Sequence, residues 1–236
     1  MNKKLEIGND HDFEVRREMY NSDLDINITV LFLSDLHFNG FSQPVASRLI
    51  ATINELNPTI ILLGGDYADT NAGLKQLEYL LNTIALRKNV FAIAGNHDQF
   101  FGIEKIRQLM IANGVSWIDK QSASLKVDKV TISIHTQADK SIIAKEELAL
   151  LLLHKPVDIQ TFAHQYHLAF AGHLHGCQCI LWQNKKGLYL GRLFYKWNRL
   201  KAQSGKCTYL ISKGLGDTLP VRYNCKRDII FVTIGQ

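Results

Sequence analysis

The stretch Gly95-Asn96-His97-Asp98 directly follows a short apolar run from Asn89 to Ala94. Ser34-Asp35-Leu36-His37 and Gly64-Gly65-Asp66-Tyr67-Ala68-Asp69 each follow a similar apolar run. Runs of this length and composition are typical of buried strands, and each of them ends in small residues and side chains that can bind a metal. These three stretches therefore decide which fold and which kind of site we expect.

Helical patterns separate the three predicted strands. Apolar side chains recur every three or four residues over 43–56, 74–84 and 103–110, as on one face of a helix. Alternating strands and helices predict right-handed crossovers and a parallel sheet. Asp35 and Asp66 are 31 positions apart, and Asp66 and Asn96 are 30 apart, which is one strand and one helix in each case. The ends of the three strands should therefore meet at one edge of the sheet.

The second half of the chain has more strand patterns. We expect a helix over 141–150 and a second sheet of mostly antiparallel character. Its predicted strands cover 124–127, 130–134, 150–153, 168–171, 177–182, 188–190, 207–211 and 229–234. Because no repeat or linker interrupts the chain, residues 1–236 are expected to form a single domain, with the motifs lying in 28–182.

The composition excludes several classes of protein. In 236 residues the sequence has 46% hydrophobic and 21% charged residues and a net charge of +5, as in soluble globular proteins. No apolar stretch forms an export signal or spans a membrane, so a cytoplasmic location is expected. The charge suits an anionic substrate or membrane surface and is too small to predict nucleic-acid binding. The four cysteines, including Cys177 and Cys179, are expected to be reduced and inert.

Several side chains at the predicted strand ends are candidate metal ligands. They are Asp35, His37, Asp66, Asn96, His154, His173 and His175. Oxygen and imidazole ligands without cysteine suit Mn²⁺, Fe²⁺ or Zn²⁺. If two ions bind, Asp66 is the natural bridge, and two carboxylates against two dications leave a charge of +2 that would attract a phosphate ester. Each motif alone is weak evidence for a metal site. The prediction rests on all of them occurring at strand ends, in one order along the same chain.

These motifs resemble those of calcineurin-like metallophosphoesterases. The family pattern is matched by Asp35-Leu36-His37, Gly65-Asp66-Tyr67-Ala68-Asp69, Gly95-Asn96-His97-Asp98, His154 and Gly172-His173-Leu174-His175. The stretch from Gly214 to Arg222 further resembles the bacterial YkuE-like branch of that family. The resemblance implies an α/β fold with mixed sheets in a four-layer αββα sandwich.

The resemblance also implies roles for individual residues. Two divalent ions are expected, Mn²⁺ first and Fe²⁺ or Zn²⁺ as alternatives, and a hydroxide bridging them would attack a phosphodiester or pyrophosphate. One ion would be held by Asp35, His37, Asp66 and His175, and the other by Asp66, Asn96, His154 and His173. His97 would contact the phosphate and protonate the leaving oxygen, Asp98 would orient the His97 ring, and Asp69 would support a ligand loop.

The substrate is left open by the sequence. The segment 185–206 mixes cations with aromatic residues, so Arg192, Lys196 and Arg199 are candidate contacts for a small phosphate ester, a lipid-linked nucleotide or a membrane surface. A solvated hairpin is equally compatible with this pattern. Two alternatives to a general phosphodiesterase are a hydrolase of the UDP-2,3-diacylglucosamine pyrophosphatase type, with peripheral contact to the inner membrane, and a catalytically inactive binding scaffold.

Overall fold

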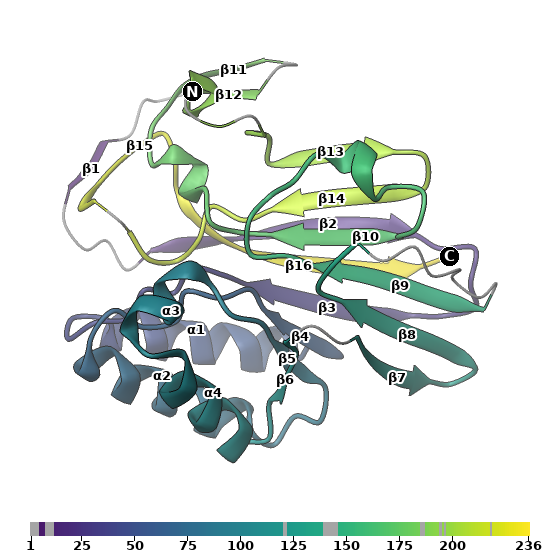
Figure 1. Ribbon diagram of the computed structural model, residues 1–236, viewed down its shortest axis with the longest axis horizontal. Helices are drawn as coiled ribbons and strands as arrows, with labels where there is room; N and C mark the ends of the chain where they lie inside the picture. Colours follow the sequence, from purple (N-terminus) through teal and green to yellow (C-terminus); the bar gives the residue numbers. More distant parts are fainter. Residues whose placement is uncertain are drawn as a thin grey trace.

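Two six-stranded sheets lie face to face in the computed structural model of the chain (Figure 1). The structure describes residues 5–7, 12–119, 122–138, 146–184, 187–193, 195, 197–217 and 219–236. The first sheet has the order β2 (Phe13–Asn21), β16 (Arg227–Gly235), β3 (Ile28–Leu33), β4 (Ile60–Leu63), β5 (Val90–Ala92), β6 (Ser116–Trp117). The second has the order β13 (Lys201–Ser204), β14 (Cys207–Ile211), β10 (Leu168–Ala171), β9 (Glu147–Leu152), β8 (Val130–His135), β7 (Ala123–Val127).

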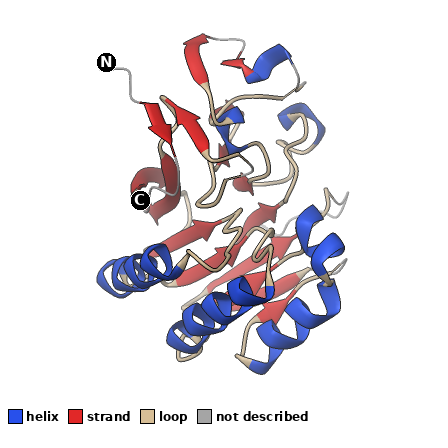
Figure 2. Cartoon of the chain, turned by 90° about the vertical axis from the view of Figure 1, so that its left-hand side faces the viewer, coloured by secondary structure: helices blue, strands red, loops and turns tan. Residues whose placement is uncertain are grey.

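Helices cover the outer face of the first sheet, as Figure 2 shows. They are α1 (Gln43–Leu56), α2 (Asn71–Ile84), α3 (Asn96–Phe101) and α4 (Ile103–Ala112). Strands β3, β4 and β5 run parallel, as the sequence predicted, and β6 adds a further parallel strand beside β5. Helix α2 begins earlier than its apolar pattern, because the Thr70 side chain accepts a hydrogen bond from Gly73 N at 3.0 Å and caps the helix.

Alternation along the strands divides the core into layers. In β3, Leu31 and Leu33 pack against the helices, whereas Val30 and Phe32 face the second sheet. Phe170 of β10 meets Phe32 from the other side, with their ring centroids 5.3 Å apart. Burial of apolar side chains on both faces of the first sheet fixes the position of its parallel strands and of the loops that follow them.

The second sheet differs from the predicted one. Strands β8, β9, β10 and β14 are parallel, and only the edge strands β7 and β13 are antiparallel, so the prediction of a mostly antiparallel sheet was wrong. The described residues between β9 and β10 and between β10 and β14 form loops, short strands and 3₁₀ helices, which lack the periodicity that reveals a crossover helix.

Three further assignments are corrected. Strand β16, predicted in the second sheet, pairs with β2 and β3 of the first. Segments 177–182 and 188–190 contribute to a separate hairpin of β11 (Ile180–Asn184) and β12 (Gly187–Leu190). The predicted helix over 141–150 is wrong for 147–150, because β9 is apolar on both faces and hides its strand alternation; residues 141–145 lie outside the described residues.

The outer face of the second sheet carries a thin layer. The 3₁₀ helix η1 (Ile159–Thr161) and the following Phe162 and Tyr166 pack on Ala149 and Leu151. The expected sandwich is therefore present, and within the described ranges its fourth layer consists of 3₁₀ helix and loop. Among the described helices, none has the length and apolar character needed to cross a bilayer.

Two small paired elements lie at one end of the sandwich. Strand β1 (Leu5–Ile7) pairs with β15 (Val221–Tyr223), and a bridge between Cys179 and Tyr223 connects β15 to the residues before β11. Figure 1 shows β1 and β15 to the left of the carboxyl ends of β10 and β14, and the β11–β12 hairpin above the second sheet.

Candidate metal centre

The loops after five parallel strands bring the predicted ligands together. Asp35 and His37 follow β3, Asp66 follows β4, and Asn96 follows β5. From the second sheet, His154 follows β9, and His173 and His175 follow β10. Ligands predicted from segments far apart in the sequence thus meet where the carboxyl ends of both sheets adjoin.

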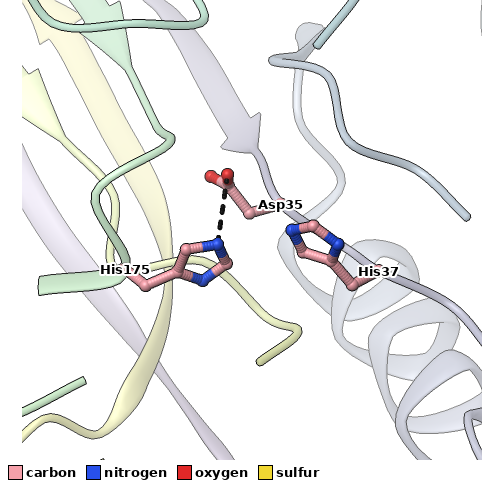
Figure 3. A group of neighbouring side chains, drawn as sticks. All are labelled: Asp35, His37 and His175. Carbon is pink, nitrogen blue, oxygen red and sulfur yellow. Dashed lines mark ion pairs between the residues drawn. The ribbon is translucent and has the colours of Figure 1, made fainter. Parts of the chain in front are cut away.

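One group consists of Asp35, His37 and His175, whose ligand atoms all lie within 4.8 Å of one another. Figure 3 shows the three side chains converging from separate segments. The Nε2 atom of His175 lies 3.6 Å from Asp35 Oδ1, and its Nδ1 atom donates to Gly216 O at 3.2 Å. All three residues are buried, so an ion held here would be largely shielded from solvent.

A second group consists of Asp66, His154 and His173, again with ligand atoms within 4.8 Å of one another. His154 Nδ1 donates to Gly64 O at 2.8 Å, which turns Nε2 toward Asn96 Oδ1 at 2.8 Å and Asp66 Oδ2 at 3.3 Å. A histidine fixed in this way by a backbone carbonyl presents its other nitrogen to a metal. Asn96 therefore lies within reach of the same ion.

Asp66 lies between the two groups, and it forms a third group with His37 and His97 whose ligand atoms also lie within 4.8 Å of one another. Its Oδ2 atom is 3.3 Å from His154 Nε2 and 3.7 Å from His37 Nε2, and its Oδ1 accepts a hydrogen bond from His97 N at 2.7 Å. Burial alone would raise the pKa of Asp66, but the neighbouring His154 and His37 hold this pKa at about 2. The carboxylate is therefore ionised at neutral pH and placed to contact ions on both sides.

The surroundings of His37 show whether these residues suit a bound metal ion. Its Nε2 atom is buried and has no hydrogen-bond partner among the described residues, whereas its Nδ1 atom lies 3.0 Å from both carboxylate oxygens of Asp69. A buried nitrogen without a partner is destabilising, and a carboxylate behind a histidine is the usual arrangement at a metal site. The donor set of oxygen and imidazole suits divalent ions.

The electrostatic field at His154 also favours a cation. Burial lowers the pKa of His154, yet Asp66 and Asp35 overcome this effect and raise that pKa to about 9. Carboxylates that stabilise a positive charge on an imidazole would stabilise a bound dication in the same place. The residues present thus fit two divalent ions in both geometry and charge.

The backbone at the ligands is unusual. Asp35, His37, Asp66, His173 and His175 have φ angles of 54°, 43°, 58°, 68° and 48°, in the left-handed region that non-glycine residues rarely adopt. Such sharp turns let each chain segment leave its strand and point a side chain back into the centre. At Gly172, an added Cβ would lie 2.0 Å from Ser34 Oγ and 2.2 Å from Asp35 Oδ2, so only glycine permits this packing.

His97 lies at the rim of the site on α3. Its side chain is 40% exposed, and its ring meets that of His37 edge to face at a centroid distance of 4.5 Å. Its Nδ1 atom lies 3.3 Å from Asp69 Oδ1. The carboxylate that contacts the His97 ring is therefore that of Asp69.

The prediction that Asp98 orients the His97 ring was wrong. Asp98 is buried and accepts hydrogen bonds from the backbone N–H groups of Gly95 at 2.7 Å and of Asp66 and Tyr67 at 2.9 Å. These three bonds occupy both oxygens and tie the loop after β4 to the start of α3. Asp98 holds the ligand loops in place.

Sequence reasoning missed the contribution of Arg222. This residue is fully buried, forms an ion pair with Asp217, and donates to Lys213 O at 3.1 Å and Gly216 O at 2.7 Å. Gly216 O is also the acceptor of His175 Nδ1. The stretch 214–222, noted in the sequence only for its resemblance, thus braces a metal ligand.

The predicted substrate contacts Arg192 and Arg199 do not line the cavity beside the ligands, but each contacts a residue that lines a neighbouring cavity. Arg192 is exposed and its Nη1 atom donates to Tyr195 O at 3.2 Å, and the exposed Arg199 lies 5.6 Å above the ring of Trp197. Neither arginine lines the cavity next to the ligands. Lys196 lies outside the described residues.

An α/β sandwich with oxygen and imidazole ligands at the strand ends of both sheets defines a class of metal-binding protein. The chain belongs to the calcineurin-like phosphoesterase family, because the model of that family matches residues 28–177.

Among curated relatives, the chain is similar to a metallophosphoesterase of Helicobacter pylori J99, with 22% identity over 92% of this chain and 62% of that protein. It is similar to phosphodiesterase YaeI of Escherichia coli, with 29% identity over 63% of this chain and 61% of that protein. It is also similar to YkuE of Bacillus subtilis, with 26% identity over 87% and 78%. The chain thus spans less than two thirds of the first two relatives.

Solved structures show the same fold. The NAD nucleotidase of Haemophilus influenzae matches with a TM-score of 0.50 and 12% identity, over 80% of this chain and 46% of that one. A 5′-nucleotidase precursor of Thermus thermophilus matches with a TM-score of 0.50 and 12% identity, over 88% and 55%. At this identity the likeness concerns the fold alone.

Proposed function

We propose that the chain is a metal-dependent phosphoesterase that hydrolyses a phosphodiester or pyrophosphate bond, with two divalent ions, Mn²⁺ first among them. The observation that carries the proposal is the meeting of two ligand groups at Asp66, beside the unpartnered Nε2 atom of His37. The similarity to a protein named phosphodiesterase YaeI supports the same reaction class.

The bound ions would polarise the phosphoryl oxygens and lower the pKa of water toward neutrality. The chain itself has to hold them in place and leave the side toward His97 open to substrate. Two groups of side chains can hold the ions in place: the buried Asp35, His37 and His175, and the partly buried Asp66, His154 and His173. The ring of His97 is half-exposed, which leaves that side of the site open to substrate.

His97 is the residue we assign to proton transfer. Because its Nδ1 atom faces Asp69 at 3.3 Å, its Nε2 atom is the one directed to substrate. The Asp69 carboxylate orients the ring so that Nε2 can give a proton to the departing oxygen. Asp69 therefore serves two histidines, since it also faces Nδ1 of His37.

The experiment compares metal content and hydrolysis. Protein stripped with EDTA and reloaded with Mn²⁺ is assayed on bis-p-nitrophenyl phosphate. Asp66→Ala should lose metal and turnover together, and His97→Ala should keep metal and lose turnover. His164→Ala, an exposed histidine away from the site, is the matched control and should retain both.

The competing proposal is a binding scaffold without catalysis. A wild-type protein that takes up no Mn²⁺ and hydrolyses neither the diester nor UDP-2,3-diacylglucosamine would favour that scaffold over the enzyme. Turnover of the lipid-linked nucleotide far above that of the simple diester would instead select the pyrophosphatase alternative.

A further inference from the structure

A cavity of about 480 Å³ opens directly on the metal ligands. One side of it is formed by Asp66, His97, His173 and His175, which belong to the centre described above. The remaining described lining residues come from η2 (His175–Cys177), the chain around it, and the segments near 191 and 219. They are Leu174, Cys177, Gln178, Cys179, Gly191, Tyr195 and Leu219.

This second side is apolar. Leu174 is buried, and the partly buried thiol of Cys177 behaves as a small apolar group. Gly191 packs so closely that an added Cβ would lie 1.9 Å from Cys177 Sγ. The wall offers surface area for van der Waals contact and no charge from its described residues.

Gln178 is a polar residue on this side of the cavity, and its side-chain amide is hydrogen-bonded to the backbone. Gln178 Oε1 accepts a hydrogen bond from Leu219 N at 3.0 Å, and its Nε2 donates to Leu219 O and to Val221 O. The amide therefore fastens the segment 219–221 to the floor of the cavity. Leu219 keeps its side chain 65% exposed at the rim, where a ligand can cover it.

The apolar surface continues into a neighbouring cavity of about 370 Å³. The two cavities share His173, Leu174 and Tyr195. The second adds Pro156, Val157 and Trp197, with Lys155 and Asp158 as its charged members. A phosphoryl group at the ligands would thus have a mostly apolar path leading away from it.

We infer that this wall of Leu174, Cys177, Tyr195 and Leu219 is a subsite for a hydrocarbon substituent on the phosphoester substrate. The inference rests on the proposed function, because the phosphoryl group is what anchors the substrate beside the wall. Contact with an apolar chain covers Leu219 and Tyr195 and removes their side chains from water, which stabilises the complex in proportion to the area buried. The substrate class is then an ester with an alkyl or acyl tail.

The test measures binding of alkyl phosphates without turnover. Methyl, butyl and octyl phosphate are titrated calorimetrically into the Mn²⁺-loaded protein. The dissociation constant should fall by about fourfold for each methylene that the wall buries. Uridine monophosphate, which has a polar substituent, should bind more weakly than octyl phosphate.

Two variants locate the effect. Leu219→Gln and Tyr195→Ser should reduce the advantage of octyl over methyl phosphate by about threefold or more, with little change for methyl phosphate. Leu86→Gln makes the same change at an exposed leucine after α2, which does not line either cavity, and should leave the series unchanged.

The outcomes separate this inference from the proposed function. Equal affinities for methyl and octyl phosphate, tighter binding of uridine monophosphate, or an unchanged chain-length effect in both variants would overturn the subsite while leaving a working phosphoesterase. A protein that retains no metal and binds none of the phosphates would overturn both.

Discussion

Asp69 Oδ1 lies 3.3 Å from Nδ1 of His97, the ring that the proposed reaction uses for proton transfer. The same carboxylate lies 3.0 Å from Nδ1 of His37, a candidate ligand. One side chain therefore positions both a metal ligand and a proton donor. Its neighbours His37 and His97 keep the pKa of Asp69 below its usual value although burial opposes this, so the carboxylate is ionised at neutral pH.

Asp69→Asn should lower turnover by about 10- to 100-fold, the usual effect of losing a carboxylate behind a catalytic or ligating histidine. A double-mutant cycle with His97→Ala divides the effect between the two histidines. If Asp69 acts through His97, the double variant should have the kcat of His97→Ala. If the two single losses in kcat instead multiply in the double variant, Asp69 acts independently of His97, and its effect on turnover comes from His37 alone.

Asp98→Asn should weaken the fold. The amide would keep one oxygen acceptor but place an NH₂ group against backbone N–H donors of Gly95, Asp66 or Tyr67. Loss of a buried hydrogen bond to a charged group costs about 1.5–3 kcal/mol in the free energy of unfolding. Urea unfolding of the metal-free variant measures this cost; an unchanged midpoint would contradict the loop-holding role.

Arg222→Met should loosen the brace at His175. Removing the guanidinium leaves Asp217 without this partner and removes one of the two donors to Gly216 O, and breaking a buried ion pair typically costs about 3–5 kcal/mol of stability. We expect weaker Mn²⁺ binding by calorimetry as well as a lower unfolding midpoint. Arg199→Met is the matched control on an exposed arginine; equal losses in both variants would contradict a specific brace.

His167 should make stability depend on pH. Burial, with Lys206 3.2 Å away, lowers the pKa of His167 to about 4, whereas an unfolded histidine has a pKa of about 6.5. Between these values the unfolded state binds more protons, so the free energy of unfolding falls as the pH drops from about 7 toward 4.

His167→Gln should therefore lose less stability than the wild type between pH 7.5 and pH 5, compared by urea unfolding in EDTA. The metal-site histidines are present in both proteins. The difference between the two proteins in how the free energy of unfolding changes with pH is therefore due to His167. A variant with the same slope as the wild type would contradict the assignment.

Much of the centre was predictable because its ligands follow strands with clear patterns. Asp35, Asp66 and Asn96 are one strand and one helix apart, and this spacing alone placed them at one edge of a parallel sheet. His154 and His173 joined them because they too end apolar runs. That these residues bind two ions stays a prediction.

Other features leave no local signal in the sequence. The family resemblance implied that Asp98 orients the His97 ring, but Asp98 accepts backbone hydrogen bonds instead, and Asp69, 28 positions before His97, contacts that ring. Strand β16 pairs with β3 across nearly the whole chain, and no pattern within either strand encodes this partner. The described crossover from β9 to β10 is a loop with the 3₁₀ helix η1, which has no helical period in the sequence.

The central claim is that the two groups of ligands bind two divalent ions, and that Asp66 of the second group contacts both ions. The most direct test is the number of Mn²⁺ ions bound per chain, measured by elemental analysis after reloading and desalting, in the wild type and in Asp66→Ala. We predict two ions per chain in the wild type, and loss of both when the shared carboxylate is removed. A wild-type protein with no bound ion, or an Asp66→Ala variant that still holds two, would contradict the claim.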